Sequence, residues 1–246
     1  MFPLQTTVFS RHPPIVTWII VGLNAIVFFF ELHLPKESLE QFTYLFGLVP
    51  ARFTHPDWAV AVGFPLDNYW PFITSLFLHG GWLHIIGNMW TLWVFGMHVE
   101  DRMGPTRYLG FYLLCGIASG IVQMLANYNA TIPAIGASGA IAGVMGAYLV
   151  MFPTSRVVVM IPIFFFPFIF DFPAVFYLGY WFLLQFFSGT LSLMKSAEAG
   201  GIAFWAHVGG FLCGAVILRL FLRPRAERTD PHADEGHMQH AWTPRR

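Results

Sequence analysis

Long apolar runs separated by shorter polar stretches dominate the chain, and they predict membrane-spanning helices. A helix needs about 20 mostly apolar residues to cross a bilayer. Six stretches meet or approach this length, at roughly 14–33, 81–99, 107–126, 138–152, 174–193 and 203–222. The pattern therefore predicts an all-α membrane protein, with a bundle of six transmembrane helices in residues 14–222.

The segments outside these runs are more polar. Residues 1–13 hold one arginine and no short apolar core with a cleavage site, so we expect no removable signal peptide. The start of the long linker 34–70 is amphipathic enough to lie along the membrane surface. Residues 223–246 are polar without periodicity, which predicts a disordered tail.

One apolar stretch, 157–170, is short and interrupted by two prolines, and a seventh span there would invert everything after it. Charge decides between the two topologies. With six spans and a cytoplasmic N-terminus, ten of the 13 Lys and Arg lie in cytoplasmic segments, and only Lys36, Arg52 and Lys195 lie outside. This is the direction that the positive-inside rule requires. The sequence thus predicts six spans, both termini in the cytoplasm, and an apolar linker at 157–170 that rests in or on the bilayer.

Composition agrees with a membrane protein: 56% of the residues are hydrophobic, 11% are charged, and the mean hydropathy is +0.60. The formal net charge of zero gives no reason to expect nucleic-acid binding. Cys115 and Cys213 both lie in apolar runs and are expected to be buried small residues rather than a disulfide framework.

Four polar residues within the predicted spans stand out, because such residues are costly in a membrane and usually functional. They are His84, Asn88, Ser138 and His207. Counting 1.5 Å per residue from the outer end of each helix places them at depths of about 4, 10, 8 and 6 Å, respectively. Three helices thus carry polar groups to one layer near the outer surface.

A hydroxyl and an imidazole in that layer can form an activated nucleophile. Gly210 and Gly214 follow His207 at i+3 and i+7, and Ala142 follows Ser138 by one turn, so the helices can approach closely. None of the 13 Asp and Glu falls in this layer on a core helix, which favours a Ser-His dyad over a triad.

Acyl transfer also needs donors for the developing oxyanion. His84 and Asn88 are four residues apart and share a helix face. Ser138 opens a predicted helix, where backbone N–H groups have no partner in the helix. Gly136 and Gly139 on either side of it allow close approach of chain and substrate. His84, Asn88 and the Ser138 N–H are therefore the candidate oxyanion donors.

Four motifs occur together: "HGGWLHIIGNM" (79–89), "VEDRMG" (99–104), "GASGA" (136–140) and "AHVGGFLCG" (206–214). In this order, over roughly 70–222, the chain resembles the rhomboid intramembrane serine proteases. The resemblance implies that Ser138 is the nucleophile and His207 the base. It also implies an oxyanion site at His84, Asn88 and the Ser138 N–H.

The same resemblance assigns structural roles. Glu100 and Arg102 resemble the family's Glu-x-Arg pair at the end of the second span, and the fifth span with the capping segment after it would form the lateral substrate gate. The chain departs from the pattern at Trp70-Pro71, where many members have Trp-Arg in the first loop. It also has Ala142 where an aromatic often stacks on the histidine, so another aromatic such as Trp205 is expected to orient His207.

The polar residues of the predicted spans allow other interpretations. His84 and Asn88 could be hydrogen bonds between helices, a role also expected for Gln185 in mid-span. The spacing of His79, His84 and His98 puts them on no common face, so we expect no metal and no other cofactor. A transporter is disfavoured because there is no internal repeat and no buried carboxylate chain.

The predicted function is an intramembrane serine endopeptidase. Its expected partners are single-pass or multi-pass membrane protein substrates and the lipid bilayer, and its expected location is the cell membrane of a prokaryote. The alternative is a catalytically inactive relative that binds membrane clients.

Overall fold

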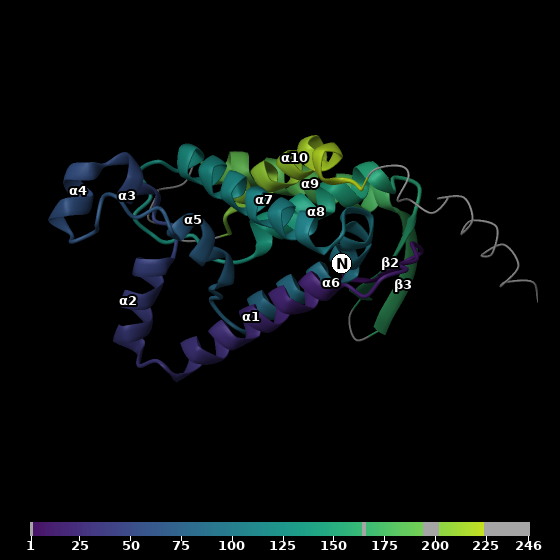
Figure 1. Ribbon diagram of the computed structural model, residues 1–246, viewed down its shortest axis with the longest axis horizontal. Helices are drawn as coiled ribbons and strands as arrows, with labels where there is room; N and C mark the ends of the chain where they lie inside the picture. The colour runs from purple at the N-terminus through teal and green to yellow at the C-terminus, as the bar shows by residue number, and fades with distance from the viewer. Residues whose placement is uncertain (1, 164–165, 194–201, 224–246) are drawn as a thin grey trace, which may run out of the picture.

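Helices make up most of the molecule (Figure 1). The computed structural model describes residues 2–163, 166–193 and 202–223. Each stretch predicted as a span is a helix: α1 (Ile15–His33), α6 (Trp82–Met103), α7 (Pro105–Ala126), α8 (Ser138–Met151), α9 (Ala174–Ser192) and α10 (Phe204–Phe221). Helix α8 is the innermost, and it contacts α6, α7, α9 and α10.

Four of the described helices are long and apolar enough to cross a membrane: α1, α7, α9 and α10. Helix α8 is apolar but has only 14 residues. Helix α6 has 22 residues, but its sequence includes His84, Asn88 and a charged last turn. The chain is thus a membrane protein with several apolar helices, and the count of six spans stays a prediction.

The linker between α1 and α6 is folded into short helices: α2 (Lys36–Phe46), α3 (Pro50–Thr54), α4 (Pro56–Ala61), α5 (Pro71–Thr74) and the 3₁₀ turn η1 (Ser75–Phe77). The buried Arg52 joins its parts. Its guanidinium donates to the carbonyls of Leu45 (3.4 Å) and Pro65 (3.3 Å), and it lies 5.0 Å from the ring centre of Phe64. The Trp70-Pro71 departure leaves this loop ordered, with Pro71 in the first turn of α5, where a missing N–H costs nothing.

The prediction of an all-α fold is wrong in one part, because the structure also contains a three-stranded antiparallel sheet. Strand β2 (Arg156–Ile163) pairs with β3 (Phe166–Pro173) and with β1 (Phe2–Thr6). The stretch predicted as an apolar linker, 157–170, is therefore mostly a β-hairpin, and the amino-terminal segment adds a strand to it. In Figure 1 the sheet lies at the opposite end of the molecule from α3 and α4.

Two predicted features lie outside the described residues. The predicted tail is described only at Arg223, and the capping segment after the fifth predicted span falls largely in 194–201.

Candidate active site

Ser138 is the first residue of α8 and directly follows a tight turn of the backbone. Two residues earlier, Gly136 has a φ of +116°, which residues with a side chain rarely adopt. The N–H of Gly136 donates to the carbonyl of Ser75 at 2.8 Å, which ties this turn to η1. The Ser138 N–H thus belongs to a first helical turn, whose N–H groups have no carbonyl partner within the helix.

His207 of α10 faces Ser138. Its Nε2 lies 2.8 Å from Ser138 Oγ, and its Nδ1 lies 2.8 Å from Oε1 of Gln185 on α9. An amide oxygen can only accept a hydrogen bond. Nδ1 therefore carries the ring proton, and Nε2 is left to accept from the serine hydroxyl.

The aromatic neighbour of His207 is Trp181 and not Trp205. The Trp181 and His207 ring centres are 5.8 Å apart with planes at 37°. Trp205 instead donates from Nε1 to the carbonyl of Gly189 at 3.1 Å and contacts Phe186 edge-on. The physical reason is helical geometry, since residues two apart point to nearly opposite sides of a helix.

His84 and Asn88 of α6 both reach the turn before Ser138. A methyl group built on Gly136 would lie 2.6 Å from His84 Nε2 and 3.5 Å from Asn88 Nδ2. The side-chain nitrogens of both residues thus converge on the backbone two residues before the serine. The glycine leaves room for them.

Behind Asn88 lies a buried chain of hydrogen bonds. Asn88 Nδ2 is 3.0 Å from Nε2 of His79, and Nδ1 of His79 is 3.4 Å from the carbonyl of Phe77. The backbone N–H of His79 donates to Oε2 of Glu31 on α1 at 3.2 Å, and Glu31 is only 3% exposed. Because an amide nitrogen has two N–H bonds, one can hold His79 while the other stays available.

Small residues bring α8 and α10 into backbone contact. A Cβ on Gly210 would collide with the carbonyl of Gly139, and one on Gly214 would collide with the carbonyl of Gly143. Gly139 also meets Ser119 of α7, whose side chain would obstruct a Cβ there. The distance between the two helices that carry Ser138 and His207 depends on these glycines.

Glu100 and Arg102 lie at the other end of α6 and contact different partners. The Glu100 carboxylate accepts from the N–H groups of Val16 and Thr17 and from the Thr17 hydroxyl, each at 2.8 Å. It therefore caps the start of α1, where a negative charge is favourable. Arg102 lies over the Phe152 ring, 5.0 Å from its centre.

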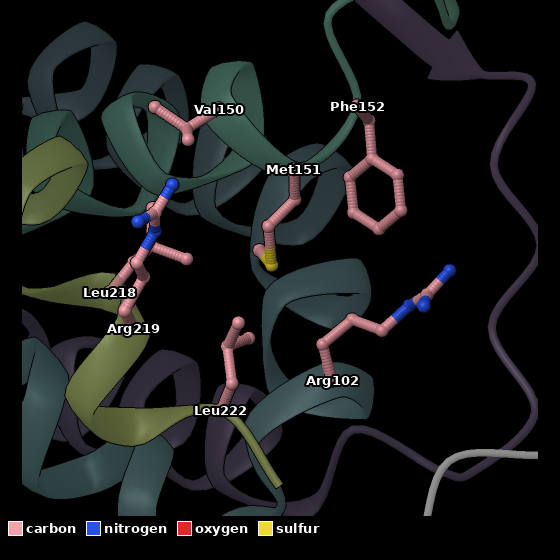
Figure 2. Close-up of a pocket in the computed structure, with 7 residues that line it drawn as sticks. All are labelled: Arg102, Val150, Met151, Phe152, Leu218, Arg219 and Leu222. Atoms are coloured by element: carbon pink, nitrogen blue, oxygen red, sulfur yellow. The ribbon is translucent and has the colours of Figure 1, made fainter. Parts of the chain in front are cut away.

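A cavity of about 250 Å³ opens at this same end of the helices (Figure 2). Arg102 and Arg219 stand on two sides of it, with Met151 and Leu222 between them. It includes neither Ser138 nor His207, because it is lined from the carboxyl ends of α8 and α10, whereas those residues lie near the amino ends.

Sequence reasoning missed several contacts at this site. The bond from Gln185 was expected only as a link between helices, and its partner is the histidine ring. The roles of Trp181, His79 and Glu31 were not foreseen. The available signal was a lone amide in an apolar helix, one turn after a tryptophan.

Comparison with known proteins adds three relatives. The chain is 28% identical over 153 residues to "Rhomboid protease GluP" of Bacillus subtilis, covering 62% of this chain and 27% of that protein. It is 33% identical over 147 residues to "Putative rhomboid protease YdcA" of the same organism, covering 58% and 65%. It is 24% identical over 214 residues to "Rhomboid protein 1, mitochondrial" of Saccharomyces cerevisiae, covering 85% and 54%.

Each alignment covers less than two thirds of the relative's own length. Relatives named as mitochondrial, from yeast, rat and Arabidopsis thaliana, stand beside bacterial ones, so the expected prokaryotic cell membrane has no support from these matches.

The model of the family described as "Rhomboid domain" matches residues 66–224, which is more than half of the chain. This range contains the helices that carry Ser138, His207, His84 and Asn88. The chain belongs to the rhomboid family.

Proposed function

We propose that the chain is an intramembrane serine endopeptidase that uses Ser138 and His207. The observation that carries the proposal is the 2.8 Å contact between Ser138 Oγ and His207 Nε2. In the first step, Oγ attacks the carbonyl carbon of a peptide bond while its proton passes to Nε2. The imidazolium then protonates the leaving amine, and water hydrolyses the acyl-enzyme with His207 again as the base.

The oxyanion of each tetrahedral intermediate would lie near the turn before Ser138. His84, Asn88 and the Ser138 N–H are the donors proposed for it. Support comes from the approach of both α6 side chains to Gly136. Donors fixed before the reaction stabilise the transition state without reorganisation, which is commonly the largest catalytic term.

The proposed topology has six spans and both termini in the cytoplasm, with the spans as predicted between residues 14 and 222. Ten of 13 Lys and Arg then lie on the cytoplasmic side. Ser138 and His207 lie near the amino ends of α8 and α10, which this topology puts at the outer side. The proposed substrates are transmembrane segments of single-pass or multi-pass membrane proteins, which would unwind locally to expose a peptide bond.

The test uses protein purified in detergent and a fluorophosphonate probe, which reacts only with an activated serine. We expect labelling at Ser138, loss of labelling in Ser138→Ala, and cleavage of a transmembrane reporter by the wild type alone. A folded wild-type protein that binds the reporter but neither cleaves it nor reacts with the probe would be a client-binding protein, which would overturn the proposal.

A further inference from the structure

We propose that Gln185 is a positioning residue for His207: its amide oxygen holds the ring proton on one imidazole nitrogen and leaves the other nitrogen free to act as the base toward Ser138. The inference rests on the proposed function. Its starting point is the 2.8 Å contact between Gln185 Oε1 and His207 Nδ1. This contact occupies the ring nitrogen that does not face Ser138.

Gln185 selects the tautomer of His207. A neutral imidazole has one proton, which can be on either nitrogen. If it were on Nε2, the ring would donate to Ser138 and could not accept the hydroxyl proton. Because Gln185 Oε1 accepts only, it favours the proton on Nδ1 and leaves Nε2 as the base. During the reaction Gln185 takes up no proton: the serine proton passes to Nε2, and Nδ1–H stays on the ring and continues to donate to Oε1.

Helix α9 also fixes the orientation of the His207 ring. Gln185 and Trp181 are four residues apart on α9, so they share one helix face. That face meets His207 twice, through the Gln185 hydrogen bond and the Trp181 ring. Together they restrain both the rotation and the tilt of the imidazole. They supply the restraint that the small Ala142 does not.

The presence of an amide side chain in α9 itself supports a specific role for Gln185. Before its last turns helix α9 carries no charged or amide side chain except Gln185, and most of its surface is exposed to the surroundings rather than to the protein. A polar side chain in such a helix is costly unless it is hydrogen-bonded. The partner of Gln185 is His207, at the reacting dyad.

The chain offers a matched control. Gln123 of α7 also has its Oε1 bonded to α10, where it accepts from the backbone N–H of Ala206 at 3.2 Å. The two glutamines thus make the same kind of bond to adjacent residues. Only Gln185 contacts the histidine ring.

The experiment measures kcat, KM, the pH profile and the melting temperature in detergent for Gln185→Met, Gln185→Glu and Gln123→Met. Methionine keeps the length of glutamine and removes the acceptor. We expect Gln185→Met to lower kcat by about 10- to 100-fold with little change in KM, as the loss of one hydrogen bond to a charged group predicts. Fluorophosphonate labelling should slow by a similar factor.

Gln185→Glu is the conservative variant, since a carboxylate also accepts from Nδ1–H. We expect it to retain most of kcat and to move the rising limb of the pH profile to higher pH. The sign follows because a nearby negative charge favours the protonated imidazole, which cannot act as a base. Among the residues that the structure describes, His84 of α6 is the titratable group whose charge acts on His207, and it is unchanged in all three variants.

Gln123→Met should lower the melting temperature as much as Gln185→Met or more, while its pH profile stays that of the wild type. The inference is overturned if Gln185→Met has a normal kcat per folded molecule, or if both methionine variants lose activity only in proportion to lost fold. A wild-type protein without cleavage or labelling would instead overturn the proposed function, so the two failures are distinguishable.

Discussion

Asn88 Nδ2 lies 3.0 Å from Nε2 of His79, and this bond holds the Asn88 amide in place beside the turn that leads to Ser138. Asn88 is 8% exposed and His79 is 4% exposed, so the pair is shielded from water. A rigid donor of this kind fits an oxyanion site better than a mobile surface amide does.

Asn88→Ala should therefore lower kcat by about 10²- to 10³-fold and change KM little, because the bond to the oxyanion strengthens only as charge develops. Steady-state kinetics and the melting temperature are measured on the same purified variant. A normal kcat per folded molecule with a lowered melting temperature would assign Asn88 a purely structural role.

Ser138→Ala and His207→Ala should each reduce cleavage of a transmembrane reporter to background. The double variant should be no worse than either single one, because residues that act as a unit are not additive. Size-exclusion profiles and melting curves check that the fold is retained. Near wild-type cleavage by Ser138→Ala would mean that another nucleophile is responsible.

Gly136→Ala should reduce both stability and activity. Its φ of +116° is strained for alanine, at a cost of about 1–3 kcal/mol, and the added methyl would press on His84 Nε2. We expect a lower melting temperature and a loss of kcat of at least about 10-fold, since 1.4 kcal/mol is a factor of ten. Gly22→Ala is the control: in the described part of the chain, no atom beyond its own helical turns and chain neighbours lies within 4 Å of the added methyl, and alanine favours a helix. An active, stable Gly136→Ala would contradict the proposed oxyanion turn.

Glu100→Gln should destabilise the fold by about 1.5–3 kcal/mol, because one of the two oxygens that accept from α1 becomes a donor facing donors. Thermal or denaturant unfolding in micelles measures the change. Asp101→Asn next to it keeps an oxygen that can accept from His12 and removes only the charge from this more exposed contact, so it should cost about 0–1 kcal/mol. Equal effects of the two substitutions would argue against a capping role for Glu100.

Topology is tested with two separate variants. One has a reporter fused after Arg246, and the other is Glu37→Cys. Six spans with ten positive charges inside predict cytoplasmic reporter activity and labelling of the cysteine by an impermeant maleimide from the outer side. Reporter activity on the outer side would require a different number of spans, and the depth estimates for Ser138 and His207 would then fail.

Helix positions could be predicted from the sequence because the apolar runs have helical length and a polar residue or proline follows each of them within two positions. The start of α8 at Ser138 is an example, since the glycine-flanked serine opens the apolar run. Local pattern suffices for such elements.

The sheet could not be predicted in the same way. Residues 157–170 form a short apolar run, which periodicity cannot distinguish from a buried helical segment. Strand β1 is more remote still, since Phe2 is opposite Met160 and nothing local marks that partner. The pairing depends on the tertiary fold, which brings two distant segments together.

The hydrogen-bond partner of His207 Nδ1 could not be predicted, for a related reason. No Asp or Glu lies in the predicted polar layer on a core helix, and spacing alone assigns Gln185 only a contact between helices. That its acceptor oxygen meets His207 depends on how α9 turns against α10, which sequence spacing does not determine.

The pairing of β1 with β2 also has a consequence for synthesis. Ribosomes make β1 well before β2, and the residue opposite Phe2 is available only after Met160 has been translated. In the proposed topology, four helices enter the membrane in that interval. Until β2 is made, the backbone groups of β1 can hydrogen-bond only to water. The pairing of β1 with β2 therefore occurs only in a chain whose first four predicted spans have already been synthesised.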